Sequence, residues 1–103
     1  MEHDTGWTNV FETETTHCQA RRIGRTVFVK CDVWGGMSLG KDWKAFTTLP
    51  EGMKPDRMQY FAGSSISGYL AVNVRISPSG VISVVCDGSN TSYWAFSASF
   101  PAA

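Results

Sequence analysis

The sequence has no long hydrophobic run and little charge. No stretch approaches the roughly 20 apolar residues of a membrane helix, and the opening residues Met1 to Asp4 are polar and acidic where a signal peptide would be basic and then apolar. Lys plus Arg and Asp plus Glu number 9 each in 103 residues. A chain with balanced charge lacks the attraction that nucleic acid or an anionic membrane requires. We therefore expect no nucleic-acid partner, no membrane insertion, and synthesis in a cytoplasm.

Cysteine and histidine are scarce as well. The chain has 3 cysteines, Cys18, Cys31 and Cys86, and 2 histidines, His3 and His17. An odd, widely spaced set differs from the dense framework of a disulfide-rich secreted domain, and without a C-x-x-C pair it predicts no zinc site. We expect buried thiols, with a disulfide between Cys31 and Cys86 conceivable if their strands pair. No cofactor or metal is predicted.

The residues that are present indicate an all-β fold. Apolar residues make up 43% of the chain and charged residues only 17%, and alternating runs recur about every 10 to 13 residues with turn residues between them. This pattern indicates a sandwich or a barrel. We expect one domain over residues 1–103, with residues 1–5 as a frayed terminus. The expected strands are 15–22, 26–34, 42–48, 58–62, 69–76, 81–86 and 92–100.

Two turns in this pattern have a specific chemistry. Ser77-Pro78-Ser79-Gly80 predicts a type I turn followed by a left-handed glycine, and so a tight hairpin. Leu49-Pro50-Glu51-Gly52-Met53-Lys54-Pro55 predicts a rigid corner, because neither a helix nor a central strand passes through two prolines and a glycine. Gly35-Gly36 is expected to end the strand that begins at Thr26.

Catalytic motifs are weak. Gly35 to Lys41 matches the G-x-x-x-x-G-K phosphate loop, but Asp42 stands where the motif needs Ser or Thr, and Pro50 leaves no room for the helix that should follow. His17 and Cys18 are adjacent in a strand and so point to opposite faces, which is poor geometry for a catalytic pair. We therefore predict a loop between strands at 35–41, and no enzymatic activity.

Aromatic residues are the remaining candidates for a function. Most of them are expected in the core or in a subunit interface. Trp34 and Trp43 flank the glycine-rich loop, where they are the best candidates to stack on the apolar face of a sugar. Hydrogen bonds to the sugar hydroxyls would come from neighbouring side chains. The predicted ligand-binding set is Trp34, Ser38, Lys41, Asp42 and Trp43.

Several stretches of the chain form an ordered set of motifs: Gly6-Trp7, Ala20 to Val29 ("R-x-x-G-x-x-V-x-V"), Leu49 to Pro55 ("L-P-x-G-Y-R-P"), Val74 to Ile82 ("V-x-I-x-x-x-G-x-V") and Ser97 to Pro101 ("x-x-S-Y-P"). In this order they resemble the motifs of the C-terminal head domains of bacteriophage tail fibres and receptor-binding proteins. They span nearly the whole sequence. Met53 and Lys54 replace the usual aromatic residue and arginine.

The resemblance implies an antiparallel β-sandwich of jelly-roll type with about seven or eight strands. It also implies a homotrimer at the tip of a fibre in the virion, assembled in the bacterial host, that binds a surface receptor, often a saccharide. Its motifs specify the scaffold, so no site residue is carried over. Two alternatives stay open: a trimerisation or capping head that binds nothing, and an accessory carbohydrate-binding module of a cell-wall hydrolase.

Overall fold

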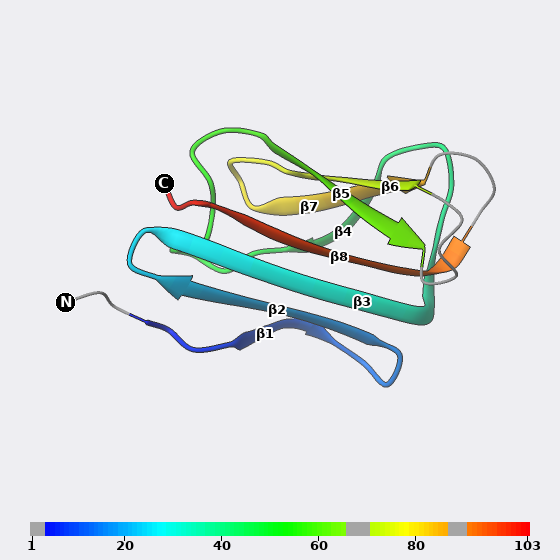
Figure 1. The fold of residues 1–103 in the computed structure, drawn as a ribbon, viewed down its shortest axis with the longest axis horizontal. Helices are drawn as coiled ribbons and strands as arrows, with labels where there is room; N and C mark the ends of the chain where they lie inside the picture. Colours follow the sequence, from blue (N-terminus) through cyan, green and yellow to red (C-terminus); the bar gives the residue numbers. More distant parts are fainter. Residues whose placement is uncertain (1–3, 66–70, 87–90) are drawn as a thin grey trace.

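A computed structural model describes residues 4–65, 71–86 and 91–103 of the chain (Figure 1). These residues form strands and no helix, which confirms the prediction of an all-β chain for the described part. The strands are β1 (Thr8–Glu12), β2 (Thr16–Ile23), β3 (Thr26–Leu39), β4 (Lys44–Thr48), β5 (Gln59–Ser65), β6 (Ala71–Ile76), β7 (Val81–Cys86) and β8 (Thr91–Pro101).

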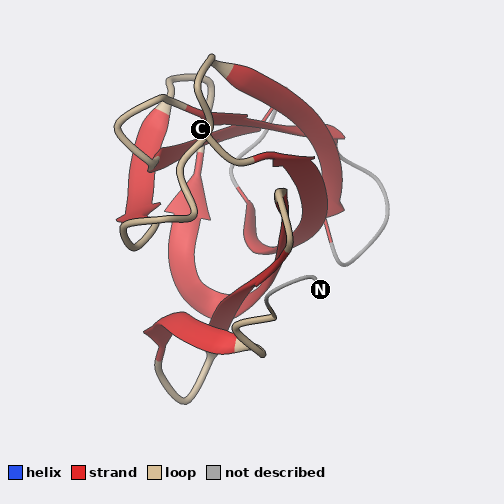
Figure 2. Ribbon diagram, turned by 90° about the vertical axis from the view of Figure 1, so that its left-hand side faces the viewer, coloured by secondary structure: helices blue, strands red, loops and turns tan. Residues whose placement is uncertain are grey.

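All eight strands belong to one antiparallel sheet in the order β1-β2-β3-β8-β5-β6-β7-β4. The sheet curls round until its two edges approach each other, so it forms a nearly closed barrel (Figure 2). The expected sandwich would need two separate sheets. Here β8 joins both halves of the molecule, because it pairs with β3 on one side and with β5 on the other.

Side chains, rather than backbone pairing, bring the two edges of the barrel together. Phe11 of β1 packs on Phe46 of β4, with ring centroids 5.4 Å apart. Phe46 in turn meets Trp94 of β8 edge-on at 5.3 Å. These rings connect the sheet edges to the centre of the core, and we call the β1–β4 contact the seam.

The core follows the alternation of the strands. In β3, Val27, Val29, Cys31 and Val33 are buried, while Phe28 and Trp34 point outward, as the period-two pattern predicts. The inward residues of β6, β7 and β8 fill the rest of the barrel: Val72, Val74, Ile76, Ile82, Val84, Cys86, Trp94, Phe96 and Phe100. The barrel interior is therefore apolar and packed.

Both predicted turns are confirmed. At the β6–β7 turn, the Gly80 N–H donates to the Ser77 carbonyl at 2.8 Å, and Gly80 has a φ of 88°. At the corner between β4 and β5, Leu49 and Met53 are buried and Gly52 has a φ of 86°. The Leu49 N–H donates to the Gly80 carbonyl at 2.9 Å, so the two turns support each other.

Several of the expected strand limits were wrong: strand 42–48 begins at Lys44, and strand 58–62 runs from Gln59 to Ser65. β3 does not end at Gly35-Gly36 but continues to Leu39, because Gly35 adopts a φ of 104° and the pairing with β8 resumes after an irregularity. β1 was missed, since its side chains are mostly exposed and only its pairing with β2 makes it a strand. At the end of the terminus expected to be frayed, Asp4 bridges to Ile23, and the Thr5 N–H donates to the Arg22 carbonyl at 3.0 Å. Residues 69 and 70 of the expected strand 69–76 lie outside the described residues.

The cysteines are free and buried. The condition set for a disulfide between Cys31 and Cys86 is not met, because β3 and β7 are not paired in the sheet. Cys86 lies opposite Val72 of β6, and Cys31 lies opposite Cys18 of β2.

Candidate functional site

The connection between β3 and β4 forms one side of a hollow on the outer surface that has both polar and apolar walls. This hollow of about 340 Å³ is lined by Lys41, Trp43, Asn73, Val85 and Cys86. It lies where Trp43, just before β4, faces outward-pointing residues of β6 and β7. We call it the Trp43 hollow.

Arg75 of β6 fixes the position of the Trp43 ring. Its guanidinium carbon lies 4.3 Å from the ring centroid, which is a cation–π contact. Trp43 is still 39% exposed beside this contact, so part of the residue is open to solvent. Asn73 and Lys41 add an amide and an ammonium group beside it. A flat apolar ring with hydrogen-bond donors around it suits a ligand that carries hydroxyls on an apolar ring.

A second aromatic surface lies on β3 and β8. Trp34 is 51% exposed and is paired in register with Tyr93, which is 52% exposed. The Trp34 indole N–H donates to Asp32 Oδ2 at 2.8 Å, so its polar atom is already engaged within β3. The surface is therefore mainly apolar, unlike the Trp43 hollow.

The predicted ligand-binding residues are only partly brought together. Lys41 and Trp43 share the Trp43 hollow, and Asp42 between them is exposed without lining it. Trp34 lies elsewhere, since β8 and β5 stand between its strand and β6 in the sheet order. Ser38 belongs to β3, and its side chain is outside the described part.

Asn73 and Arg75 were missed by the sequence analysis. They lie about 30 positions from Trp43 along the chain, and only the β6–β7–β4 pairing places them beside it. A weak signal was present: they are the polar members of the otherwise apolar run Val72 to Ile76. Val85 is an apolar residue on the outward face of β7. Its position there is explained in part because it lines the Trp43 hollow.

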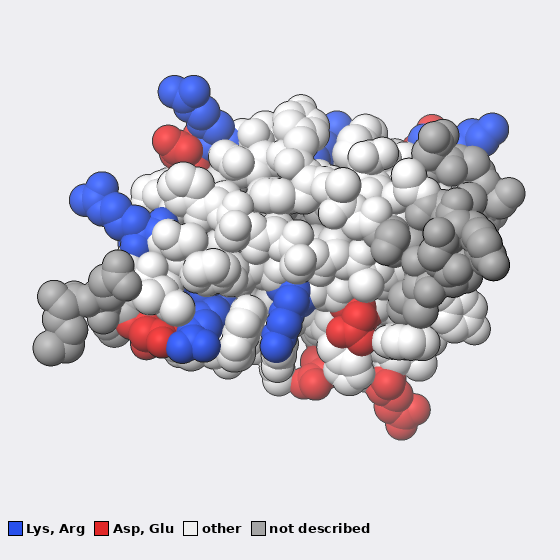
Figure 3. All heavy atoms as spheres, viewed as in Figure 1, with Lys and Arg blue, Asp and Glu red and all other residues white. Residues whose placement is uncertain are grey.

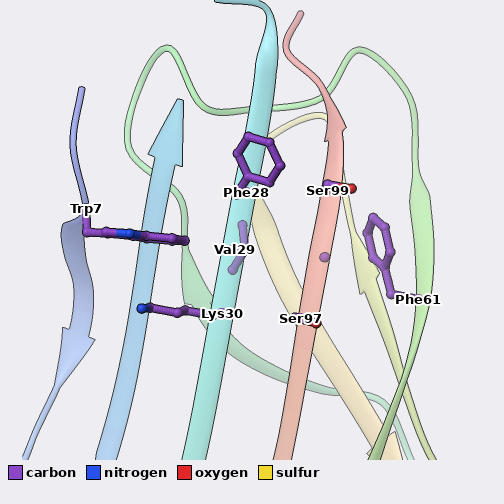
Figure 4. Close-up of a pocket in the computed structure, with 8 residues that line it drawn as sticks. Trp7, Phe28, Val29, Lys30, Phe61, Ser97 and Ser99 are labelled. Carbon is purple, nitrogen blue, oxygen red and sulfur yellow. The ribbon is translucent and has the colours of Figure 1, made fainter. Parts of the chain in front are cut away.

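A larger hollow of about 490 Å³ opens over β3 and β8 (Figure 4). Trp7 and Phe28 stand on one side of it and Phe61 on the other, with Ser97 and Ser99 on the strand between them. The Lys30 ammonium lies 4.2 Å from the Trp7 ring centroid and so belongs to a cation–π contact.

A further hollow of about 490 Å³ follows the line where β5 meets β8, and Ser97 contributes to both hollows. The two strands pair only from Gly63 to Ser65, so they diverge beyond Phe96. The residues that line this second hollow are uncharged, and all but Phe96 are small: Ala62, Gly63, Ala95, Phe96 and Ser97. We call this surface the β5–β8 face. In Figure 3 the charged side chains lie mainly around it.

The described residues contain no group of three or more His, Cys, Asp or Glu side chains placed to hold a metal ion. His17 Nδ1 lies 3.3 Å from Glu12 Oε1 on the surface, whereas Cys18 points into the core, so the two face opposite sides as predicted. Within the same described ranges there is no helix of the length and apolarity that crossing a membrane requires.

A comparison with models of known protein families and with curated proteins finds no match to this chain.

Proposed function

We propose that this chain is the head domain of a bacteriophage tail fibre, which binds a saccharide receptor on the bacterial surface during adsorption. The order of motifs from Gly6-Trp7 to Ser97–Pro101 supports this proposal, because the set resembles such heads over nearly the whole sequence. The head would stand at the fibre tip of the virion, after assembly in the host cytoplasm.

The Trp43 hollow is the observation that carries the proposal. It combines an exposed aromatic ring, held by Arg75, with the side chains of Asn73 and Lys41. The β3–β4 connection that carries Trp43 lies at the opposite end of the molecule from the first and last described residues (Figure 1). A shaft attached at the terminal end would therefore leave this connection pointing away from the virion.

Three copies of the head would bind a cell far more tightly than one. A single shallow site gives weak binding, and linking several sites multiplies the apparent affinity by about 10²–10⁴ when they engage together. The β5–β8 face supports a homotrimer, because its residues are uncharged and charged residues are depleted at the core of subunit interfaces.

Binding to cells and to glycans tests the proposal. Labelled protein should bind at least one strain of a bacterial panel and one class of glycan on an array of bacterial surface saccharides. Trp43→Ala should weaken that binding at least tenfold, and Trp34→Ala, on the separate aromatic surface, serves as the matched control. Equal loss in both variants, or none in Trp43→Ala, would remove the Trp43 hollow from the proposal.

The molecular mass in solution separates the alternatives. A stable monomer would favour the carbohydrate-binding module of a cell-wall hydrolase over the tail-fibre head. A trimer that binds no cell and no glycan would favour the capping head that binds nothing. If the β5–β8 face joins the subunits, Ser97→Arg should break the trimer, whereas Ser79→Arg at the exposed β6–β7 turn should leave it intact.

A further inference from the structure

Cys18 and Cys31 face each other across β2 and β3. The two strands are joined by a two-residue turn, Gly24-Arg25. Gly24 has a φ of 60°, whereas Arg25, like every described residue other than glycine, does not have a positive φ. A glycine with positive φ in the first central position is the requirement of a type II′ hairpin turn. The turn fixes Ile23 and Thr26 as the closing pair and therefore sets the register of the whole ladder.

This register puts the two cysteines in a non-hydrogen-bonded pair. The closing pair of a two-residue hairpin exchanges hydrogen bonds, and the pairs then alternate along the ladder. Cys18 and Cys31 are the fifth pair beyond Ile23 and Thr26, so they fall on a non-bonded position. At the other end of the ladder, the Trp34 N–H donates to the Thr15 carbonyl at 2.7 Å. Thr15 and Trp34 are therefore a hydrogen-bonded pair, as this alternation requires.

A non-hydrogen-bonded pair has the backbone spacing that a disulfide needs. Its α-carbons are about 4.5 Å apart, inside the range of about 4.4–6.8 Å found for disulfides. Both side chains point into the barrel, at 0% and 3% exposure, and the neighbouring Cys18 thiol raises the pKa of Cys31. Cys86 has a different strand partner, Val72, and is not a third member of this group.

The seam controls access to the pair. Phe11 of β1 lies opposite Cys18 in the β1–β2 ladder, and its ring packs on Phe46 across the seam. β1 is one of the two edge strands of the sheet and has a register shift between Asn9 and Phe11, so it can open locally while the rest of the sheet stays paired. Opening of β1 removes the residue that covers Cys18.

We propose that Cys18 and Cys31 form a disulfide when the protein meets a small-molecule disulfide such as oxidised glutathione. One cysteine loses its proton to solvent and attacks a glutathione sulfur, which gives a mixed disulfide and releases one glutathione thiolate. The second cysteine then loses its proton and displaces the second glutathione. The two released thiolates take up the two protons, so two protein thiols are oxidised and one glutathione disulfide is reduced to two thiols.

The bond would lock the β2–β3 hairpin once the protein leaves a reducing cytoplasm. It closes a loop of roughly 14 residues, which restricts the unfolded chain and stabilises the fold. For a domain of this size the expected rise in melting temperature is about 5–15 °C. This inference does not depend on the proposed receptor binding.

Peptide mapping tests the proposal directly. The purified chain is incubated with oxidised glutathione, blocked with iodoacetamide and digested with trypsin, which separates the cysteines into the peptides Met1–Arg21, Cys31–Lys41 and Ile76–Ala103. We expect the first two peptides to be linked, with a mass about 2 Da below the sum of the reduced peptides, and Cys86 alkylated. Three alkylated thiols, stable glutathione adducts or a link to Cys86 would overturn the proposal.

Two variants control for folding and access. Cys86→Ala should keep the link and the rise in melting temperature. Cys31→Val, which matches the valines at 29 and 33 on the same strand, should keep the fold by circular dichroism and lose both effects. Phe11→Ala should speed formation of the bond at least severalfold, and an unchanged rate would overturn the role of the seam.

Discussion

Phe11 of β1 packs on Phe46 of β4 with ring centroids 5.4 Å apart and ring planes at 49°, and this contact joins strands that stand at opposite ends of the sheet order. The barrel is therefore completed by two aromatic side chains. The closed shape depends on side-chain packing at this point.

Phe11→Ala should lower the free energy of unfolding by about 1–2 kcal/mol, because it removes a half-buried ring and an aromatic pair. Urea denaturation gives the stability, and hydrogen exchange should speed up in β1 and β4 first. Phe28→Ala is the matched control, since both rings are 36% exposed but Phe28 lies on the outer surface. Equal losses for the two variants would mean that the seam adds nothing.

Gly63→Ala should destabilise the fold by about 3 kcal/mol or prevent it from forming, which is the upper range for overpacking. A Cβ at position 63 would lie 2.5 Å from the Ala95 carbonyl oxygen and 2.9 Å from the Phe96 Cβ, at the place where β5 crosses β8. Because a backbone atom is the obstacle, no side-chain movement relieves the clash. Ala62→Ser, on the exposed side of the same strand, should change thermal stability little.

Arg22→Ala should lower stability by about 1–2 kcal/mol, within the range for partly exposed hydrogen bonds from a charged group. Its side chain donates to the Gly24 carbonyl at 2.8 Å and to the Gly52 carbonyl at 2.6 Å, so it ties the β2–β3 turn to the corner that follows β4. Arg25→Ala, at an exposed position in the same turn, is the control. If Arg22→Ala loses no more stability than Arg25→Ala, the hydrogen bonds of Arg22 do not stabilise the corner, and its prolines alone account for its rigidity.

Stability should fall as the pH rises above about 8.5, the ordinary pKa of a cysteine in an unfolded chain. The hydrogen bond with Cys18, together with burial, raises the pKa of Cys31 in the folded state. Below pH 8.5 the Cys31 thiol keeps its proton in both the folded and the unfolded state, so this group adds no pH dependence to the stability. Above it the unfolded state loses the proton first, so the folded state binds more protons and is disfavoured by up to about 1.4 kcal/mol per pH unit.

Chemical denaturation of the reduced protein from pH 7 to 10 measures this slope. Cys31→Val should flatten the profile relative to the natural chain, because the titrating group is gone. A slope that is unchanged in Cys31→Val would contradict the assignment to this thiol.

Features set by neighbouring residues were predictable from the sequence. The β6–β7 hairpin follows from Pro78 and Gly80, and β7 was predicted to the residue as Val81–Cys86. The corner after β4 follows from its two prolines. In each case the conformation is dictated within a few residues, so no knowledge of the distant chain is needed.

Features set by pairing across the chain were not predictable. β1 reads as an exposed, mostly polar segment and becomes a strand only because β2 offers it an edge. The passage of β3 through Gly35 depends on β8 beyond the irregularity. For the same reason Lys41 and Trp43 were found as site candidates while Asn73 and Arg75 were not, since the sheet order decides which outward side chains meet.

The place of β8 in the sheet has a consequence for biosynthesis. This strand is the last of the eight along the chain, yet it holds β3 and β5 together at the middle of the sheet. A ribosome delivers β1 to β7 before the piece that unites them. Until Pro101 emerges, the nascent chain has two unjoined groups of strands with open edges, which invite aggregation. We therefore expect the sheet to be completed only after residues 91–101 have left the ribosome, and deletion of residues 91–103 to yield insoluble protein.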